Sequence, residues 1–382
     1  MNINFSHIGF IPLQANIFFS VLIFFITGIA FQANNYSIKT ILIILIIGLL
    51  ISIAKKNLNT ILKNSVLLLS SFFCGGYLYQ IQQNKFENFR KLTNDKTFNI
   101  TGTIKDIIKL EHSRFKKKII FNVREIHEIK SGSVYKENIL IQIYTNTYKN
   151  IQIDNTIKIE NLFFKSFNNN TYIDHLTKDN IATSLFESKF TNQFISQKKF
   201  SFPRWINKIK NYIFLNIKLK TCQESFALFS SIFLGNTKNC SQKLMTEYRD
   251  FFQLWGLSHY LARAGLHMLI IIFLWSTLIS SLKINFRLQQ TILLMLIIIY
   301  YLLSWASIPF LRSLSMFLLY KTCIILNLQI NSLHLLNVAC FLMIAISPMQ
   351  IFSLDFQLSF GLTYALIFLS ISKQKNKIST NY

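Results

Sequence analysis

The sequence predicts a multi-pass α-helical membrane protein with an inserted small all-β, OB-like extracytoplasmic domain. The first observation behind this prediction is composition, because 51% of the 382 residues are hydrophobic. These residues gather in runs that approach the roughly 20 apolar residues needed to cross a bilayer. The second observation is that the long runs stop between residues 82 and 200, where apolar and polar residues alternate. The third is the placement of Lys and Arg, which orients the segments relative to the membrane.

About eight apolar runs have the character of membrane segments, and the shorter ones fit tilted or re-entrant pieces. The first run has no basic n-region and no small-residue cleavage site, so we expect an anchor helix and not a cleaved signal peptide. The runs cover residues 13–31, 39–54, 62–80, 258–280, 289–305, 309–327, 332–347 and 355–372.

The middle block predicts strands, because apolar and polar positions alternate in short segments between loops rich in Asn, Ser, Lys and Gly. About five strands within roughly 90 residues suit an OB-type barrel. An elongated sandwich would produce the same pattern. The expected strands lie at 98–104, 118–123, 138–144, 156–164 and 181–187.

Basic residues predict which loops face the cytoplasm. The loop after the second run and the tail after the last run are both Lys-rich, and counting crossings from either end puts the β-domain and residues 256–262 outside. The cytoplasmic markers are Lys55, Lys56, Lys63, Lys283, Arg287, Lys373, Lys375 and Lys377. The resulting division is helical anchor 1–81, β-domain 82–200, basic amphipathic helix 201–222 and helical membrane domain 223–382.

Residues 201–220 contain five basic residues and no acid, and apolar residues interleave with them at helical spacing. This pattern predicts a helix lying in the membrane interface. The alternative is a cationic ramp that leads a polyanion toward a pore. The net charge of +24 is compatible with attraction to a polyanion and also with a Lys-rich bias of an AT-rich genome.

Two histidines, His259 and His267, lie eight residues apart at the start of a strongly apolar segment. An ionisable residue at the membrane edge is costly, which makes the pair a functional-site hypothesis; the alternative is that the rings satisfy helix ends. The five cysteines have no zinc spacing, so we expect neither a metal nor another cofactor, and pairing of Cys222 with Cys240 stays open.

Several ordered motifs resemble the ComEC family of bacterial DNA-uptake channels. Residues 256–267 are similar to the family's His-Leu-Leu-Ala-x-Ser-Gly-Leu-His segment, and Leu234-Gly235-Asn236 takes the place of its Leu-Gly-Asp turn. Residues 309–316 resemble its x-x-x-Arg-Ala-x-x-Met helix, and Pro348 with residues 354–360 resembles its Asp-Pro…Phe-Gln-Leu-Ser-Phe segment. The resemblance covers about residues 225–372.

The sequence departs from the family at Asn236, Arg263 and Ala264. Larger members continue into a metallo-β-lactamase-like domain, whose His-x-His-x-Asp-His string does not occur here. The chain therefore fits a short member, a fragment or one half of a split system.

The resemblance implies a cell (inner) membrane channel component that passes single-stranded DNA into the cytoplasm during natural transformation. We do not expect an enzyme, because the sequence shows no nucleophile with a nearby base. Because the sequence also has no P-loop, we expect a separate cytoplasmic motor to drive transport. Other partners would be the lipid bilayer, further DNA-uptake proteins and a second copy of the chain. The alternatives are a small-solute permease and a membrane assembly scaffold with an accessory β-domain.

The candidate residues fall into two groups. The guanidinium of Arg312 is expected either to bind a phosphate group or to form an ion pair with Asp355. Gln357 is expected to form a hydrogen bond between two helices. The channel candidates are Asn236, His259, Arg263, Gly265, His267, Arg312 and Gln357. The DNA-guiding candidates are Phe115, Lys116, Lys117, Lys118, Lys208, Lys210, Lys218 and Lys220, with Phe163, Phe164 and Lys165 as further strand positions.

Overall fold

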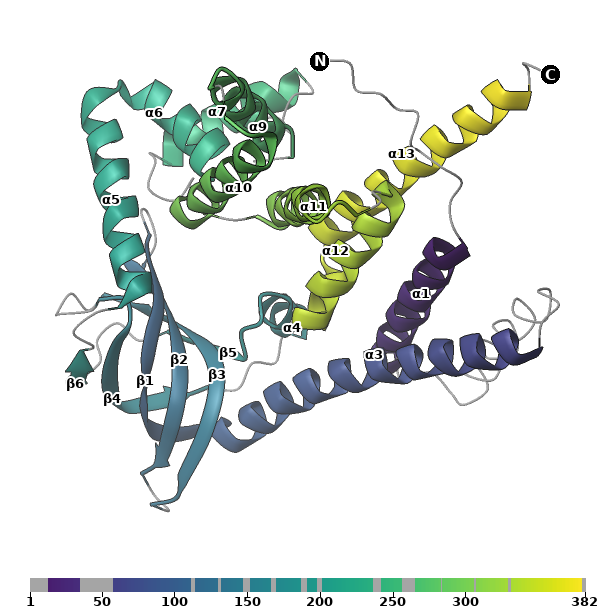
Figure 1. Ribbon diagram of the computed structural model, residues 1–382. Coiled ribbons are helices and arrows are strands. Elements are labelled where there is room, and N and C mark those ends of the chain that lie inside the picture. Colours follow the sequence, from purple (N-terminus) through teal and green to yellow (C-terminus); the bar gives the residue numbers. More distant parts are fainter. Residues whose placement is uncertain are drawn as a thin grey trace. The chain divides into compact units, whose positions relative to one another are not determined.

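A computed structural model of the chain is shown in Figure 1. It describes residues 13–34, 58–110, 114–129, 132–146, 152–165, 170–186, 191–197, 201–235, 242–255, 265–282, 284–305, 307–328 and 331–379. The chain divides into two compact units. We call Phe86–Leu311 the central unit, and Met1–Lys85 together with Arg312–Tyr382 the terminal unit.

The central unit contains a six-stranded mixed sheet with strand order β5-β3-β2-β1-β4-β6. All neighbouring pairs are antiparallel except β3 and β5, which are parallel. The strands are β1 (Lys96–Lys109), β2 (Lys117–Glu128), β3 (Val134–Thr145), β4 (Asn155–Phe164), β5 (Thr183–Phe186) and β6 (Thr191–Gln197). Each of the five expected strands overlaps an observed one.

Two elements of this domain were not expected. Helix α4 (Asn170–Lys178) precedes β5, and its short length and Asn-rich start hide it in a segment that has the composition of a loop. Strand β6 reads Thr-Asn-Gln-Phe-Ile-Ser-Gln, which is too polar to show a period of two. The parallel β3–β5 pairing follows from α4, because a parallel return of the chain needs a crossover connection.

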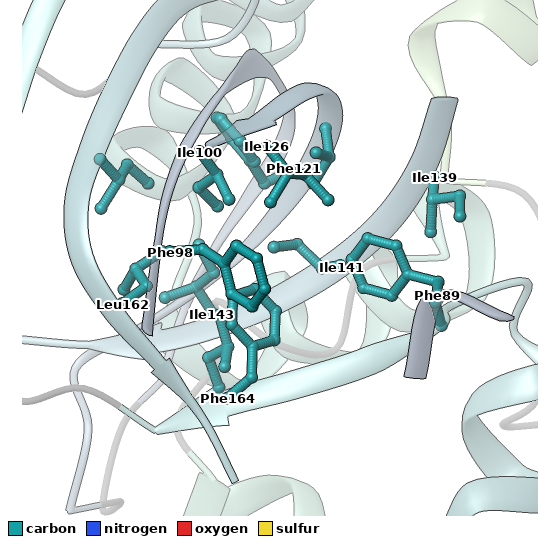
Figure 2. Packing of buried hydrophobic residues seen from close by; sticks show 14 of the residues in the cluster. Phe89, Phe98, Ile100, Phe121, Ile126, Ile139, Ile141, Ile143, Leu162 and Phe164 are labelled. Carbon is teal, nitrogen blue, oxygen red and sulfur yellow. The ribbon is translucent and has the colours of Figure 1, made fainter. Parts of the chain in front are cut away.

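The sheet encloses a hydrophobic core that also takes in the end of a helix (Figure 2). Helix α3 (Leu58–Thr93) continues beyond the apolar run and inserts Phe86 and Phe89 into the core. The Phe89 ring meets Phe164 edge-on at a centroid distance of 6.1 Å. Arg90, the residue after Phe89, donates from Nε to the Ala182 carbonyl at 2.7 Å, and burial lowers the pKa of its guanidinium.

Helix α5 (Phe202–Lys220) is the basic helix expected from the sequence, and it is fixed to the sheet at its first turn. Ser201 caps the helix by accepting from the Arg204 backbone N–H, and its hydroxyl also donates to the Asp154 carboxylate. The Arg204 side chain donates to the Ile153 carbonyl at 3.1 Å and to Asn155 Oδ1 at 2.9 Å. Because all these partners precede or open β4, the start of the helix is held at the beginning of that strand.

The remaining helices of the central unit follow α5 in the chain. Helix α5 packs against α6 and α10, and α9 packs against α10. The bounds are α6 (Gln223–Phe229), the π-helix η2 (Ser230–Leu234), α7 (Gln242–Leu254), α9 (Gly265–Ser280) and α10 (Phe286–Leu303). Helix α11 (Ile308–Ile325) contains the boundary between the two units.

In the terminal unit, α1 packs against α12, and α12 packs against α13. Phe25 of α1 contacts Phe341 of α12 at 5.0 Å between ring centroids. The Tyr364 hydroxyl of α13 donates to Asn337 of α12 at 2.7 Å, which is a typical polar link between membrane helices. The bounds are α1 (Leu13–Ala33), α12 (Ser332–Ile346), the 3₁₀-helix η3 (Pro348–Phe352) and α13 (Leu354–Ser379).

Three of the described helices are long and apolar enough to cross a membrane: Phe286–Leu303, Ile308–Ile325 and Leu354–Ile371. Phe18–Ala33, His267–Ser280 and Ser332–Ile346 are apolar but shorter. These segments coincide with six of the expected runs, a seventh lies in α3, and the run at 39–54 lies outside the described residues.

Glycines allow α1 and α3 to touch backbone to backbone. A Cβ on Gly28 would clash with the Phe72 carbonyl oxygen, and one on Gly75 would clash with the Phe25 carbonyl oxygen. Small residues at such crossings let membrane helices approach closely.

We therefore expect Gly28→Ala to force α1 and α3 apart and to destabilise the protein by about 1–3 kcal/mol, the usual cost of overpacking. The measurement is thermal unfolding of the detergent-purified chain. Gly361→Ala is the matched control, because a Cβ there meets nothing within 4 Å. Equal stability of the two variants would contradict the close crossing.

Candidate functional site

The structure places the channel candidates in different parts of the molecule. His267 lies in α9 of the central unit, whereas Arg312 and Gln357 lie in the terminal unit. Gly265 is the first residue of α9. Asn236, His259 and Arg263 lie outside the described residues.

His267 is buried, with 6% of its surface exposed, and packs against the π-helix η2. Its ring meets Phe233 edge-on at 6.2 Å between centroids. The carbonyl of Phe233 accepts a hydrogen bond from the Tyr300 hydroxyl of α10 at 2.5 Å. The imidazole is therefore part of the packing around η2 and is nearly closed off from solvent.

The turn after η2 is held by backbone hydrogen bonds. Gly235 adopts a left-handed conformation with φ of 73°, which glycine reaches without steric cost, and its N–H donates to the Ser230 carbonyl. The Leu234 carbonyl accepts from the Trp305 N–H at 2.9 Å. We call Phe233, Leu234, Gly235, Tyr300 and Trp305 the turn cluster.

Lys210 of α5 supports this cluster from outside. Its ammonium donates to the Ser304 carbonyl at 2.9 Å and lies 5.2 Å from the centroid of the Trp305 ring. Phe214, one turn further along α5, meets the same indole edge-on. Among the four lysines of α5 expected to guide DNA, Lys210 therefore has a structural contact, while Lys208, Lys218 and Lys220 are exposed.

A second constellation lies on the β-domain, where three aromatic rings gather from separate segments. Tyr144 and Phe186 stack nearly parallel, with centroids 4.8 Å apart and planes 7° apart. Phe115 lies 6.2 Å from Tyr144 and 5.9 Å from Phe186. We call these three rings the aromatic platform. Half of the Phe186 surface is exposed to solvent.

Two cations border the aromatic platform. Arg114 lies 5.8 Å from the centroid of the Phe115 ring, and Lys118 lies 5.8 Å from that of Tyr144. Burial raises the pKa of the Tyr144 phenol, with Tyr172 and Asp179 adding to the shift, so the ring stays neutral at physiological pH. The group thus combines flat π-surfaces with positive charge.

Strand register explains why these side chains meet. Lys118 pairs with Tyr144 across β2 and β3, and Tyr144 pairs with Phe186 across β3 and β5, so the three side chains form one row. Asn146 holds Phe115 beside them, because it accepts from the Lys116 N–H at 2.8 Å and donates to the Arg114 carbonyl at 3.2 Å.

Sequence reasoning identified Phe115 and Lys118 but missed Tyr144 and Phe186. The pairing of β3 with β5 depends on the intervening helix α4, and no local pattern reveals it. The two candidate rings of β4 differ in exposure. Phe164 is buried in the core, whereas Phe163 is 44% exposed.

Arg312 and Gln357 both bond to backbone carbonyls of one segment, residues 351–359. The Arg312 guanidinium donates from Nη1 to the Ser359 carbonyl, and Gln357 donates from Nε2 to the Ile351 carbonyl at 3.0 Å. Asp355 is exposed, and the described residues include no ion pair between it and Arg312. The direct ion pair between Arg312 and Asp355, which the sequence left open as an alternative, is therefore not among the contacts of the described residues.

Metal chemistry finds no support in the part of the chain that the structure describes. Its residues contain no group of three or more His, Cys, Asp or Glu side chains that could hold a metal ion.

Comparison with known proteins gives one match. No curated protein and no solved structure matches the chain. A family model described as Competence protein matches residues 232–381, which include the turn cluster, His267, Arg312 and Gln357. Residues 232–381 of this chain are thus similar to the Competence protein family, the family whose motifs the sequence resembles.

Proposed function

We propose that this protein is a component of the DNA-uptake machinery that passes single-stranded DNA across the cytoplasmic membrane. Support for a role in competence comes from the domain at residues 232–381 and from helices long and apolar enough to span a bilayer. The β-domain receives the strand, and the helices of the Competence domain conduct it.

The observation that carries this proposal is the aromatic platform. Bases of a single strand stack on aromatic side chains while cations follow the phosphates, and this mode of binding tolerates any sequence. The platform offers the stacked rings of Tyr144 and Phe186, with Phe115 beside them and the cations Arg114 and Lys118 at their edge. A duplex keeps its bases stacked on one another, so the arrangement favours single strands.

An OB-like character of the β-domain agrees with this function. Strands β1, β2 and β3 are consecutive antiparallel neighbours, β4 returns to the other side of β1, and β5 joins β3 in parallel. Partly open five-stranded barrels of the OB type bind oligonucleotides on such surfaces. Strand β6 extends the sheet beyond β4.

The β-domain lies outside the cytoplasmic membrane in this proposal, as the Lys and Arg distribution favours. The energy for transport comes from a separate motor, because the sequence has no P-loop. The direct test in cells is to delete the gene and measure the entry of labelled DNA into the cytoplasm, which should stop.

The triple variant Phe115→Ala, Tyr144→Ala, Phe186→Ala should lose affinity for single-stranded DNA. Each base that no longer stacks costs about 1–3 kcal/mol, or roughly 5- to 150-fold in affinity. The measurement is fluorescence anisotropy of a labelled single-stranded oligonucleotide with the full-length protein in detergent, with the matching duplex measured in parallel.

Val134→Ala is the matched control, because it shortens an exposed apolar side chain of β3 outside the aromatic platform. We expect it to bind like the wild type. If the wild type binds single strand and duplex equally, or if the triple variant binds as tightly as the control, the platform is not a strand-binding surface.

Topology makes a second prediction. In a background with the five native cysteines replaced by Ser, Lys136→Cys at an exposed position of β3 should react with a membrane-impermeant maleimide on intact spheroplasts. Lys373→Cys, at an exposed position of α13, should react only after permeabilisation. The reverse pattern would put the β-domain in the cytoplasm.

A further inference from the structure

Arg312 is a positively charged residue near the start of α11 with no carboxylate partner in the described part of the chain. Its guanidinium is half-buried and makes one hydrogen bond there, from Nη1 to the Ser359 carbonyl. That carbonyl is an uncharged acceptor and also accepts from the Thr363 hydroxyl at 2.8 Å. The charge of Arg312 is therefore unmatched by any acidic side chain of the described residues.

Polar atoms beside this bond lack partners of their own. Arg312 Nε and Ser359 Oγ are both buried, and neither has a hydrogen-bond partner among the described residues. Buried polar groups in proteins are nearly always paired, so unpaired donors mark a place where a missing group completes the set. Here the open donors are one N–H of a guanidinium and one hydroxyl, and both suit an anionic oxygen.

The other buried cation of α11 is placed differently. The Lys321 ammonium lies 5.6 Å from the ring centroids of both Phe317 and Tyr320, so aromatic faces compensate its charge. Arg312 has no such ring contact in the described structure. Within α11, aromatic rings thus compensate the charge of Lys321, whereas Arg312 keeps an N–H donor without a partner among the described residues.

We propose that Arg312 and Ser359 form a binding site for a phosphodiester group. A guanidinium presents N–H donors in a planar fork that matches phosphate oxygens, and a Ser hydroxyl adds a donor for a further oxygen. A phosphodiester carries a single negative charge, which neutralises Arg312 without excess. The hydrogen bond from Arg312 Nη1 to the Ser359 carbonyl keeps the guanidinium next to Ser359.

Two sources supply this chemistry, the backbone of a DNA strand and the headgroup of a phospholipid. The strand as source rests on the proposed function, in which each phosphodiester of the passing DNA meets the site in turn. A single contact of this kind holds the DNA strand weakly. Weak binding is compatible with transport, since tight binding would stop the movement of the strand.

The experiment compares Arg312→Gln with Lys321→Gln, two variants that each remove one positive charge from α11. Binding of a single-stranded oligonucleotide to the full-length protein in lipid-free detergent is measured over a range of salt concentrations. A second arm uses an oligonucleotide whose phosphodiesters are replaced by uncharged methylphosphonates. In a third arm, native mass spectrometry counts anionic phospholipid retained by each variant.

For a DNA phosphodiester, Arg312→Gln should lower the salt slope by about 0.7, the value for one lost contact on single strands. Affinity should fall several-fold, Ser359→Ala should weaken binding without changing the slope, and Lys321→Gln should match the wild type. The difference between Arg312→Gln and the wild type should vanish with the methylphosphonate strand. Arg312→Lys should keep the slope but not the full affinity, because an ammonium lacks the fork.

For a lipid headgroup, Arg312→Gln should instead lose retained phospholipid while its DNA salt slope stays that of the wild type. If Arg312→Gln alters neither DNA binding nor lipid retention relative to Lys321→Gln, the phosphodiester site is refuted. A wild type that binds no single strand at all refutes the proposed function, and the lipid arm then still decides the site. Matching melting temperatures of the variants exclude unfolding as the cause.

Discussion

The hydrophobic interior of the sheet is the constraint on which the central unit depends. Its strands surround buried Phe and Ile side chains, and the end of α3 closes the same core with Phe86 and Phe89. Removing these rings from water stabilises the fold by roughly 25 cal/mol for each Å² of apolar surface. The core thereby fixes the register of the strands, since a slip by one residue would turn every core side chain toward solvent.

Strand register then fixes the surface chemistry. The row formed by Lys118, Tyr144 and Phe186 exists because β2, β3 and β5 pair at these residues. The aromatic platform is therefore built on strands whose opposite faces are packed into the core, and only Phe115 comes from a loop. Rigid placement favours binding, because less conformational freedom is lost when a ligand arrives.

The sequence was sufficient to separate a β-rich middle block from apolar helices and to identify the parts of the candidate site that are local. Alternation located β1 to β5, and basic amphipathic spacing located α5. The polar strand β6 and the short helix α4 have no such periodicity, and the β3–β5 pairing that depends on α4 could not be predicted. Phe186 was missed for the same reason.

The lysines of α5 show a different limit of sequence reasoning. A run of basic residues gives no sign of which ones are used internally, and Lys210 turns out to lie over Trp305 because it shares a helix face with the buried Phe214. Arg312 shows the opposite case, because a charged residue within an apolar run is recognisable from the sequence alone. Its neighbour Ser359 had no distinguishing pattern.

Helix α5 is attached at two places within the central unit, and this has a mechanical consequence. Arg204 and Ser201 fasten its first turn to the start of β4, and Lys210 and Phe214 fasten its middle to the segment around Trp305. Six residues, about 9 Å of helix, separate Arg204 from Lys210. The helix is continuous between these two attachment points, so α5 connects them rigidly. A displacement of the start of β4 would therefore be transmitted through α5 to the segment around Trp305, whose backbone N–H donates to the Leu234 carbonyl.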